Sequence, residues 1–418
     1  MEQAKKNSRH EGGCIYCGSE GPFSDEHAVC AGLGGDDNAW LLKDCVCRVC
    51  NTDIFSKLET KFLRSSPVAL ARLFLQPLTR NRGTKTGVPS VQPKVSYIRE
   101  PQSGILLEAE LGAGGSSVVL PQLLIVNATE ITVTGPDAGS AATFLSELQK
   151  ALSDEVTLIE KSREGFEVAY ETTPLIWKDN AYVQGETAPH ARPPKTGIWI
   201  EPLIQPETVQ GGEALLPRMF RRRAGQLVCR ANAVEHAAFF LTALRNAPEL
   251  LDSSKVGAAG TVHDRPAFHQ RYVMDMSVHD RVLTKIGLNL VAKLLGLDVI
   301  RNSTFDAAVT YARDGDGGIH KLPPETAAQL TDMLGAAIPE RHNLALLSVP
   351  CPDGGHGLAF LVRLYGGPAE VFMLAEFKEP IPELRRPIVL LVDYVNQRIE
   401  RPTIAECVIE SARKKGPA

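Results

Sequence analysis

The stretch CIYCGSEGPFSDEHAVCAGLGGDDNAWLLKDCVCRVCN, residues 14–51, decides how the amino-terminal part of this chain folds. It begins with one Cys-x-x-Cys pair, Cys14 and Cys17, and closes with a second, Cys47 and Cys50. Each pair forms a tight turn that aims two sulfurs at one point, and four thiolates make the tetrahedral ligand set of a structural zinc ion. A segment of about 50 residues buries too little surface to hold itself together unaided, so we expect zinc to stabilise it.

Other interpretations of these cysteines remain open. Cys45 lies two residues before Cys47 and is an alternative zinc ligand. Cys30 is expected to act as a small buried apolar residue. Reduced buried cysteines rarely come as two CxxC pairs. A redox dithiol is a weaker alternative, because no strand-helix context of the thioredoxin type is visible around the pairs.

Polar residues of types that often take part in catalysis lie between the two CxxC pairs and directly after the second pair. Glu26 and His27 are adjacent between the two pairs, and Asn51 follows Cys50 directly. The run resembles HNH endonucleases, in particular the group in which two CxxC pairs flank an E-H motif and end in C-x-x-C-N; phage Holliday-junction resolvases are similar in plan. The resemblance is specific over residues 14–51 and extends less specifically to about residue 76.

The resemblance implies a ββα-metal fold and a role for each matched residue. His27 would be the general base, Glu26 and Asn51 would bind the catalytic Mg²⁺ or Mn²⁺, and the zinc would stay structural. The family's middle asparagine often orients the base histidine, and Asn38 is the nearest candidate for that role. The family often has proline where this chain has Cys30, a departure that we expect to affect packing and not chemistry.

Elementary chemistry supports the same roles for these side chains. A neutral imidazole can take a proton from water near pH 7, and a carboxylate supplies the hard oxygen that magnesium prefers. Adjacent side chains on a regular strand point to opposite faces, so Glu26 and His27 can share a site only where the strand ends or bulges. Asn51 is expected to begin the helix after the second CxxC pair, where it is either a metal ligand, an N-cap or both.

Charge suggests where nucleic acid would bind. The chain has a formal net charge of −4, but residues 43–87 hold nine basic and three acidic side chains, a local charge of +6. Lys57, Lys61 and Arg64 are spaced to share one helical face, which is expected to contact phosphates unless it is an ordinary solvated face. A second basic run, PRMFRRR at 217–223, is open to two interpretations, contact with nucleic acid or pairing with acidic residues.

The remainder of the chain predicts a larger region that mixes helices and strands. With 44% hydrophobic and 22% charged residues the composition is that of an ordinary globular protein, and the length allows two or three domains. We expect an α+β protein with a zinc-bound nuclease module over 1–87, a mixed strand and helix region over 88–195, and an α/β region over 196–418. Strands are predicted at 95–98, 105–111, 117–120, 130–134, 343–349, 358–365 and 370–375. Helices are predicted at 66–76, 140–152, 232–246, 277–295 and 403–414, and the fourth has Ser277 as its N-cap.

The sequence therefore predicts a metal-dependent HNH endonuclease that acts on nucleic acid, with DNA as the expected substrate. The larger region would select the target, sense a signal or set an oligomeric state that the sequence does not determine. The main alternative is a zinc module that binds nucleic acid without cutting it; another is an enzyme whose chemistry lies in residues 95–418. No apolar run of 18 residues and no signal peptide is recognised, so a cytoplasmic protein with no membrane contact is expected.

Overall fold

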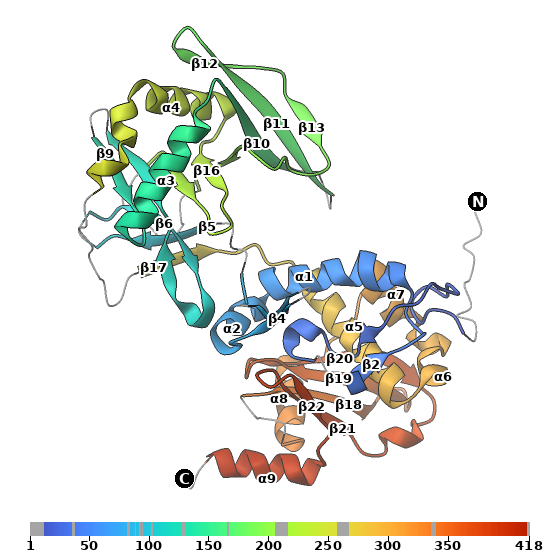
Figure 1. Ribbon diagram of the computed structural model, residues 1–418. Helices are drawn as coiled ribbons and strands as arrows, with labels where there is room; N and C mark the ends of the chain where they lie inside the picture. Colours follow the sequence, from blue (N-terminus) through green and yellow to red (C-terminus); the bar gives the residue numbers. More distant parts are fainter. Residues whose placement is uncertain are drawn as a thin grey trace. The chain divides into compact units, whose positions relative to one another are not determined.

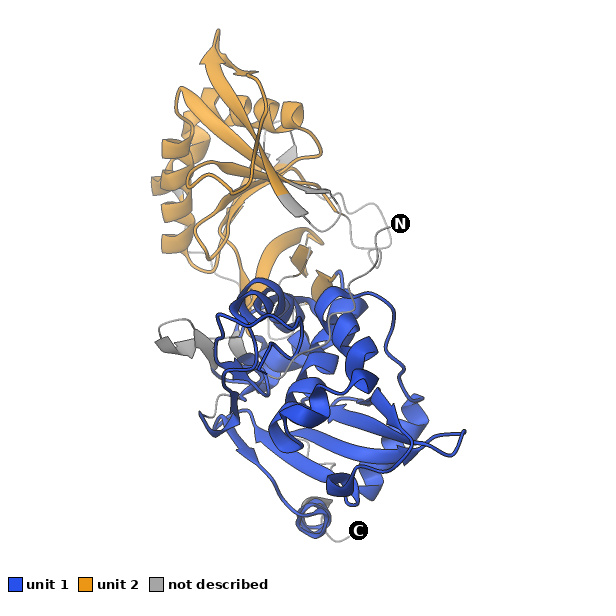
Figure 2. Ribbon diagram, turned by 90° about the vertical axis from the view of Figure 1, so that its right-hand side faces the viewer, with its two compact units in different colours: residues 1–92, 112–115, 273–418 blue, residues 93–111, 116–272 orange. Residues whose placement is uncertain are grey.

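A computed structural model describes most of the chain as two compact units (Figures 1 and 2). The described residues are 12–35, 38–81, 84–87, 89–91, 93, 95–101, 103–127, 130–164, 167–204, 216–256, 267–335 and 340–415. Unit 1 contains residues 1–92, 112–115 and 273–418, and unit 2 contains residues 93–111 and 116–272. The amino-terminal segment therefore shares a unit with the last third of the chain, and the division expected at 195/196 falls inside unit 2.

The amino-terminal part of unit 1, residues 12–75, is called the cysteine module below. Its two short strands pair antiparallel, with Glu26 opposite Leu42 and His27 opposite Leu41. A π-helical turn follows the second CxxC pair and leads into two helices. The elements are β1 (Glu26–His27), β2 (Leu41–Leu42), η3 (Val49–Phe55), α1 (Ser56–Ser65) and α2 (Pro67–Leu75). Ser66 caps α2 by accepting a hydrogen bond from the Val68 amide, as its place before Pro67 predicts.

The carboxy-terminal part of unit 1 is an antiparallel sheet in the order β20-β19-β18-β21-β22, accompanied by helices. Apolar runs of residues form its strands, whose middle residues are almost all buried. The strands are β18 (His342–Pro350), β19 (His356–Arg363), β20 (Ala369–Phe377), β21 (Ile388–Asp393) and β22 (Arg398–Glu400). The helices are α5 (Met276–Leu294), α6 (Leu297–Ile300), α7 (Asp306–Asp314), α8 (Pro324–Met333) and α9 (Ile404–Lys415). The hairpin β3 (Thr79–Asn81) and β4 (Thr84–Gly87) also belongs to unit 1.

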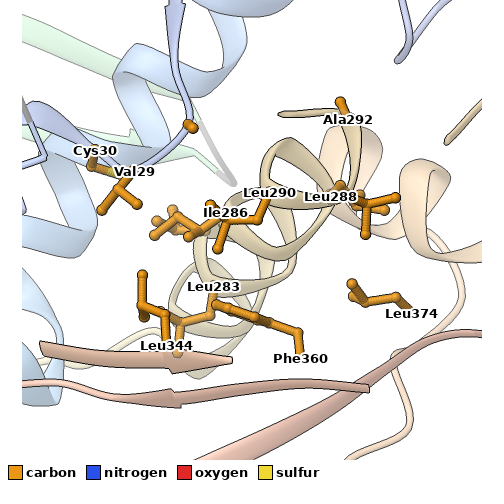
Figure 3. Close-up of a cluster of buried hydrophobic side chains, with 14 of the residues drawn as sticks. Val29, Cys30, Leu283, Ile286, Leu288, Leu290, Ala292, Leu344, Phe360 and Leu374 are labelled. Atoms are coloured by element: carbon orange, nitrogen blue, oxygen red, sulfur yellow. The ribbon is translucent and has the colours of Figure 1, made fainter. Parts of the chain in front are cut away.

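Helix α5 is the centre of unit 1. Asp275, and not the expected Ser277, caps it by accepting a hydrogen bond from the Val278 amide at 3.2 Å. Nearly every residue of its middle is buried, because one hydrophobic core joins α5 to the sheet and to the cysteine module. Figure 3 shows Leu283 and Ile286 of α5 among side chains from both partners. The sequence predicts one apolar face for this helix, and the structure buries its other faces as well.

Two glycines permit close packing within unit 1. Gly287 lies in α5 where an added Cβ would come 2.8 Å from the ring of Phe360 in β19. Gly34 has a φ of +83°, and a Cβ there would overlap the Cα of Tyr394. Glycine is therefore required at both positions, and Gly34 ties the cysteine module to the turn that follows β21.

Unit 2 is built on a nine-stranded mixed sheet in the order β12-β11-β10-β14-β16-β15-β8-β9, with β13 beside β11. Its strands are β8 (Gln122–Asn127), β9 (Glu130–Thr134), β10 (Glu155–Glu164), β11 (Glu167–Lys178), β12 (Ala181–Gln184), β13 (Ala188–His190), β14 (Ile198–Glu201), β15 (Arg218–Arg221) and β16 (Leu227–Arg230). A second sheet, β17-β5-β6-β7, holds β5 (Val95–Arg99), β6 (Leu106–Leu111), β7 (Ser117–Val119) and β17 (Ala267–Arg271). Apolar side chains of α3 (Ala138–Ala151) and α4 (Val234–Asn246) share a core with the larger sheet.

The basic run at 217–223, which includes β15, pairs with acidic side chains of unit 2. Arg221 lies 2.5 Å from Glu147, and Arg222 lies 2.6 Å from Glu201. Arg218 is fully buried and donates to the carbonyl oxygens of two leucines, Leu106 and Leu216. Pairing with acidic residues is thus the interpretation that the described contacts favour for Arg221 and Arg222.

Candidate metal centre and the adjoining polar network

The two CxxC pairs converge on one point in the cysteine module. The sulfurs of Cys14, Cys17, Cys47 and Cys50 all lie within 4.8 Å of one another, and all four cysteines are free thiols. Sulfurs at this spacing could hold a structural zinc ion, as the sequence predicts. Cys45 is buried nearby but does not belong to this group of four, so the expected ligand set stands without it.

Local hydrogen bonds give the cysteine turns their shape. The Cys47 amide donates to the Cys14 sulfur at 3.3 Å, and the Cys50 amide donates to the Cys47 sulfur at 3.5 Å. A hydrogen bond between the side chains of Cys14 and Cys50 lowers the pKa of Cys14 and raises the pKa of Cys50, so one proton is shared by the pair. Amide donors that point at sulfur favour the thiolate form, which is the form that binds metal.

Residues from the carboxy-terminal part of unit 1 support the same turns. Arg301 donates to the Gly13 carbonyl at 3.1 Å, and the side chain of Arg313 in α7 hydrogen-bonds the Cys50 thiol. A zinc ion bound by four thiolates would carry net negative charge, and the guanidinium of Arg313 would offset part of it. The cysteine centre is therefore completed by parts of the chain far from it in sequence.

Glu26 is the first residue of β1, and its side chain turns inward. It is only 4% exposed, and Oε1 accepts from the ammonium of Lys285 and from the Asn289 amide at 3.3 Å. Burial raises the pKa of Glu26, and the nearby charge of Lys285 opposes that rise. The predicted metal ligand thus lies beside a cation that belongs to the protein itself.

Lys285 also binds a second carboxylate, Glu59 of α1, at 2.5 Å. The Cys30 thiol donates to the same oxygen of Glu59 at 3.1 Å. Cys30 is buried, as expected, but it serves as a hydrogen-bond donor and not as a purely apolar residue. These contacts form what we call the Lys285 network, which consists of Glu26, Cys30, Glu59, Lys285 and Asn289.

His27 and Asn51 lie at the edge of this network. The His27 carbonyl accepts from the Asn289 amide at 3.0 Å, and its side chain is half-buried. Burial raises the pKa of Glu59, but the charge of Lys285 outweighs burial, and the net pKa is lowered. The His27 imidazole is near enough to the Glu59 carboxylate to add a smaller contribution in the same direction as Lys285. His27 therefore lies beside the Lys285 network.

Asn51 lies in η3, one turn before α1 begins, and not at the first residue of a regular helix. Its amide nitrogen donates to the Ser24 hydroxyl at 3.1 Å and to the Asp25 carbonyl at 2.9 Å. These bonds hold Asn51 against the residues that lead into β1. Asn51 is thus bonded to the two residues that directly precede Glu26. The hydrogen bonds described for Asn51 do not reach the Glu26 carboxylate itself.

The remaining predicted residues lie at the surface. Asn38 is exposed at the start of a short 3-10 helix, Asn38–Trp40, and its role as an orienting residue stays a prediction. Lys57, Lys61 and Arg64 are all exposed on α1, which is the common face that their spacing predicts. Lys61 also lies 2.7 Å from Asp275, the cap of α5, so one of the three charges is partly neutralised.

Another group in unit 1 has the composition of a metal site. Ligand atoms of His279, Asp280 and Glu370 lie within 4.8 Å of one another. The ammonium of Lys321 lies 3.0 Å from Asp280 and 2.7 Å from Glu370, and His279 lies 2.7 Å from the same glutamate. The described contacts of this group are therefore those of a salt-bridge cluster centred on Lys321.

Sequence reasoning missed Glu59, Lys285 and Asn289 as site residues. Lys285 and Asn289 are four residues apart in a helix whose surroundings are almost entirely apolar, so they lie on one face. In the sequence, two polar residues spaced by four within a largely apolar helix could have indicated a buried polar site.

Comparison of the chain with protein families, with curated proteins and with solved structures found no match. Among the residues that the structure describes, none of the helices has the length and apolar character needed to cross a membrane.

Proposed function

We propose that this protein is a metal-dependent HNH endonuclease that hydrolyses phosphodiester bonds of nucleic acid, with DNA as the expected substrate. One observation carries the proposal. Asn51, directly after a cysteine of the clustered set, hydrogen-bonds the residues that lead into Glu26 and His27. The order of β1, β2 and α1 around the four cysteines is also the order that a ββα-metal module has.

The donor chemistry suits a hard divalent cation. Among the described hydrogen bonds, those to Glu26 reach Oε1, and those from Asn51 use its nitrogen. The second carboxylate oxygen and the amide oxygen are therefore the groups that would hold Mg²⁺ or Mn²⁺. When bound, such an ion would stabilise the negative charge that develops on the phosphate.

The chain's own residues would do the remaining work. His27, half-buried beside two carboxylates, would accept a proton from the attacking water. The exposed side chains of Lys57, Lys61 and Arg64 would contact backbone phosphates and set the orientation of the strand. The clustered cysteines, with zinc bound, would keep η3 and the residues before β1 in place.

A second candidate function is a module that binds nucleic acid without cutting it. The pairing of Glu26 with Lys285 favours this candidate, because a carboxylate that is buried against an ammonium has less affinity for another cation. Under this proposal the Lys285 network would serve only to fold the module.

Nicking of supercoiled plasmid separates the two functions. Wild-type protein with Mg²⁺ or Mn²⁺ should nick or cut the plasmid, and His27→Ala should still bind DNA while its cutting rate falls by about 100-fold or more. Asn38→Ala tests the orienting role. Glu20→Gln, which changes an exposed residue between the two CxxC pairs, is the control for general damage to the module. Binding by the wild type without metal-dependent cutting would establish the non-catalytic module, and equal cutting by His27→Ala would remove His27 from the mechanism.

A further inference from the structure

We infer that Lys285 and Asn289 of α5 are positioning residues of the nuclease site, and that they hold Glu26 so that one of its oxygens faces the divalent cation. The inference rests on the proposed function and assigns part of the site to the carboxy-terminal part of unit 1. Lys285 contacts Glu26 and Asn289 contacts His27, and each pair is more than 250 residues apart in sequence.

Lys285 joins two carboxylates that come from different elements of the cysteine module. Its ammonium contacts Glu26 of β1 and Glu59 of α1, and its side chain is only 1% exposed. Two carboxylates and one ammonium leave one net negative charge. The network therefore retains attraction for a cation, while repulsion between Glu26 and Glu59 is removed.

Asn289 lies one helical turn beyond Lys285 and fixes the same strand. Its amide nitrogen donates to the His27 carbonyl at 3.0 Å and to Oε1 of Glu26 at 3.3 Å. Its amide oxygen accepts from the Tyr16 hydroxyl at 2.7 Å. One side chain thus fixes the backbone of the proposed base, the carboxylate of the proposed ligand, and a residue of the first CxxC turn.

The position of Lys285 argues that it does more than stabilise the fold. A buried ion pair is often no more stabilising than apolar side chains of similar volume, and several buried residues near Lys285 in α5, including Leu283, Ile286 and Leu288, are apolar. An apolar residue at this position would suit the hydrophobic core. An ammonium that binds one oxygen of Glu26 and leaves the other available is the arrangement by which ligating carboxylates are oriented.

The network also reaches a partly exposed position on α1. The Glu59 side chain is 24% exposed, whereas Glu26 is nearly inaccessible. Glu59 lies in α1 between Lys57 and Lys61, which are both exposed. The Lys285 network therefore begins in the core at α5 and ends at a partly exposed side chain on the side of α1 away from Lys57, Lys61 and Arg64.

Binding of Mn²⁺ to the full chain, followed by electron paramagnetic resonance, tests the inference without relying on activity. Zinc-loaded Asn289→Ala should bind Mn²⁺ about tenfold or more weakly than the wild type, the range typical for loss of groups that orient metal ligands. Lys285→Met should also bind Mn²⁺ more weakly, because the loss of the group that orients Glu26 outweighs the removal of one competing positive charge. The matched control is Lys293→Met, because Lys293 lies in the same helix and donates to the Leu41 carbonyl at 3.0 Å. It should bind Mn²⁺ as the wild type does.

Plasmid nicking measured over a range of Mn²⁺ concentrations completes the test. The two variants should need more Mn²⁺ for half-maximal rate, and Lys293→Met should not. If Lys285→Met fails to fold, by circular dichroism and zinc content, Asn289→Ala decides, because it removes no charge. Mn²⁺ affinity equal to that of Lys293→Met in the folded variants overturns the inference. A wild type that never cuts, with Mn²⁺ binding weakened in both variants, instead refutes the nuclease and leaves the positioning role intact.

Discussion

The ammonium of Lys285 contacts the carboxylate of Glu26 across 259 residues of sequence. This ion pair lies where the cysteine module meets α5, and both side chains are nearly inaccessible to solvent. The amino-terminal module and the carboxy-terminal part of unit 1 are therefore one structure, and a complete description of the candidate site needs both. The predictions below test the parts of that structure separately.

Zinc content should depend on the four clustered cysteines and not on Cys45. We expect Cys50→Ser to lose the zinc that the purified wild type carries, because four thiolates set the tetrahedral site. Cys45→Ser, which changes a buried cysteine outside the group, should keep one equivalent. Metal analysis by mass spectrometry measures both, and equal zinc in the two variants would contradict the assignment.

Substitution of Gly287 by alanine should destabilise unit 1, although alanine favours helices. The added methyl would lie 2.8 Å from the Phe360 ring and 3.0 Å from Leu374, in a close-packed core. Overpacking of this kind costs about 1–3 kcal/mol, more than the gain of up to about 1 kcal/mol in helix propensity. Urea unfolding measures the change, and Gly318→Ala is the control because no atom lies within 4 Å of its added Cβ. Equal midpoints for the two variants would show that α5 is not packed as described.

The local elements were largely predictable, whereas the candidate site was predictable only in part. Apolar periodicity and capping place α5 within a residue of its observed bounds, because those signals act between near neighbours in sequence. The four cysteines were found because CxxC spacing by itself dictates the turn. The pairing of Lys285 with Glu26 has no local signal, since it depends on how two distant segments pack. The same reason explains why the sequence did not predict that unit 2 interrupts unit 1.

Acid should destabilise unit 1 partly through His342. Burial lowers the pKa of His342 to about 3, from an ordinary value of 6.5, so the unfolded chain takes up this proton first as pH falls. The contribution of neutral His342 to the free energy of unfolding is complete above pH 6.5. It is lost as pH falls from 6.5 toward 3, by about 1.4 kcal/mol per pH unit over most of that range. Urea midpoints of the wild type should therefore fall more steeply between pH 6.5 and 5 than those of His342→Gln. Parallel curves would mean that His342 is not responsible.

Arg230 should be far more important to the stability of unit 2 than its neighbour Arg222. Arg230 binds Glu108 through two nitrogens at 2.9 and 3.0 Å, and both side chains are 3% exposed. Arg230→Met leaves Glu108 buried without its partner, which costs about 3–5 kcal/mol. Arg222→Met removes a partly exposed pair with Glu201 and should cost about 0–1 kcal/mol. Thermal unfolding of unit 2 measures both, and similar losses would refute the distinction.

The insertion of unit 2 within unit 1 also determines when the candidate site can form during protein synthesis. A ribosome makes Glu26, His27 and the four cysteines early, then translates all of unit 2 before α5 emerges. Until that time the first CxxC turn lacks Asn289 and the Glu26 carboxylate lacks Lys285. A nascent chain on the ribosome would thus carry the proposed catalytic side chains in an unfinished arrangement, and any cutting activity would be delayed until most of the polypeptide has been made.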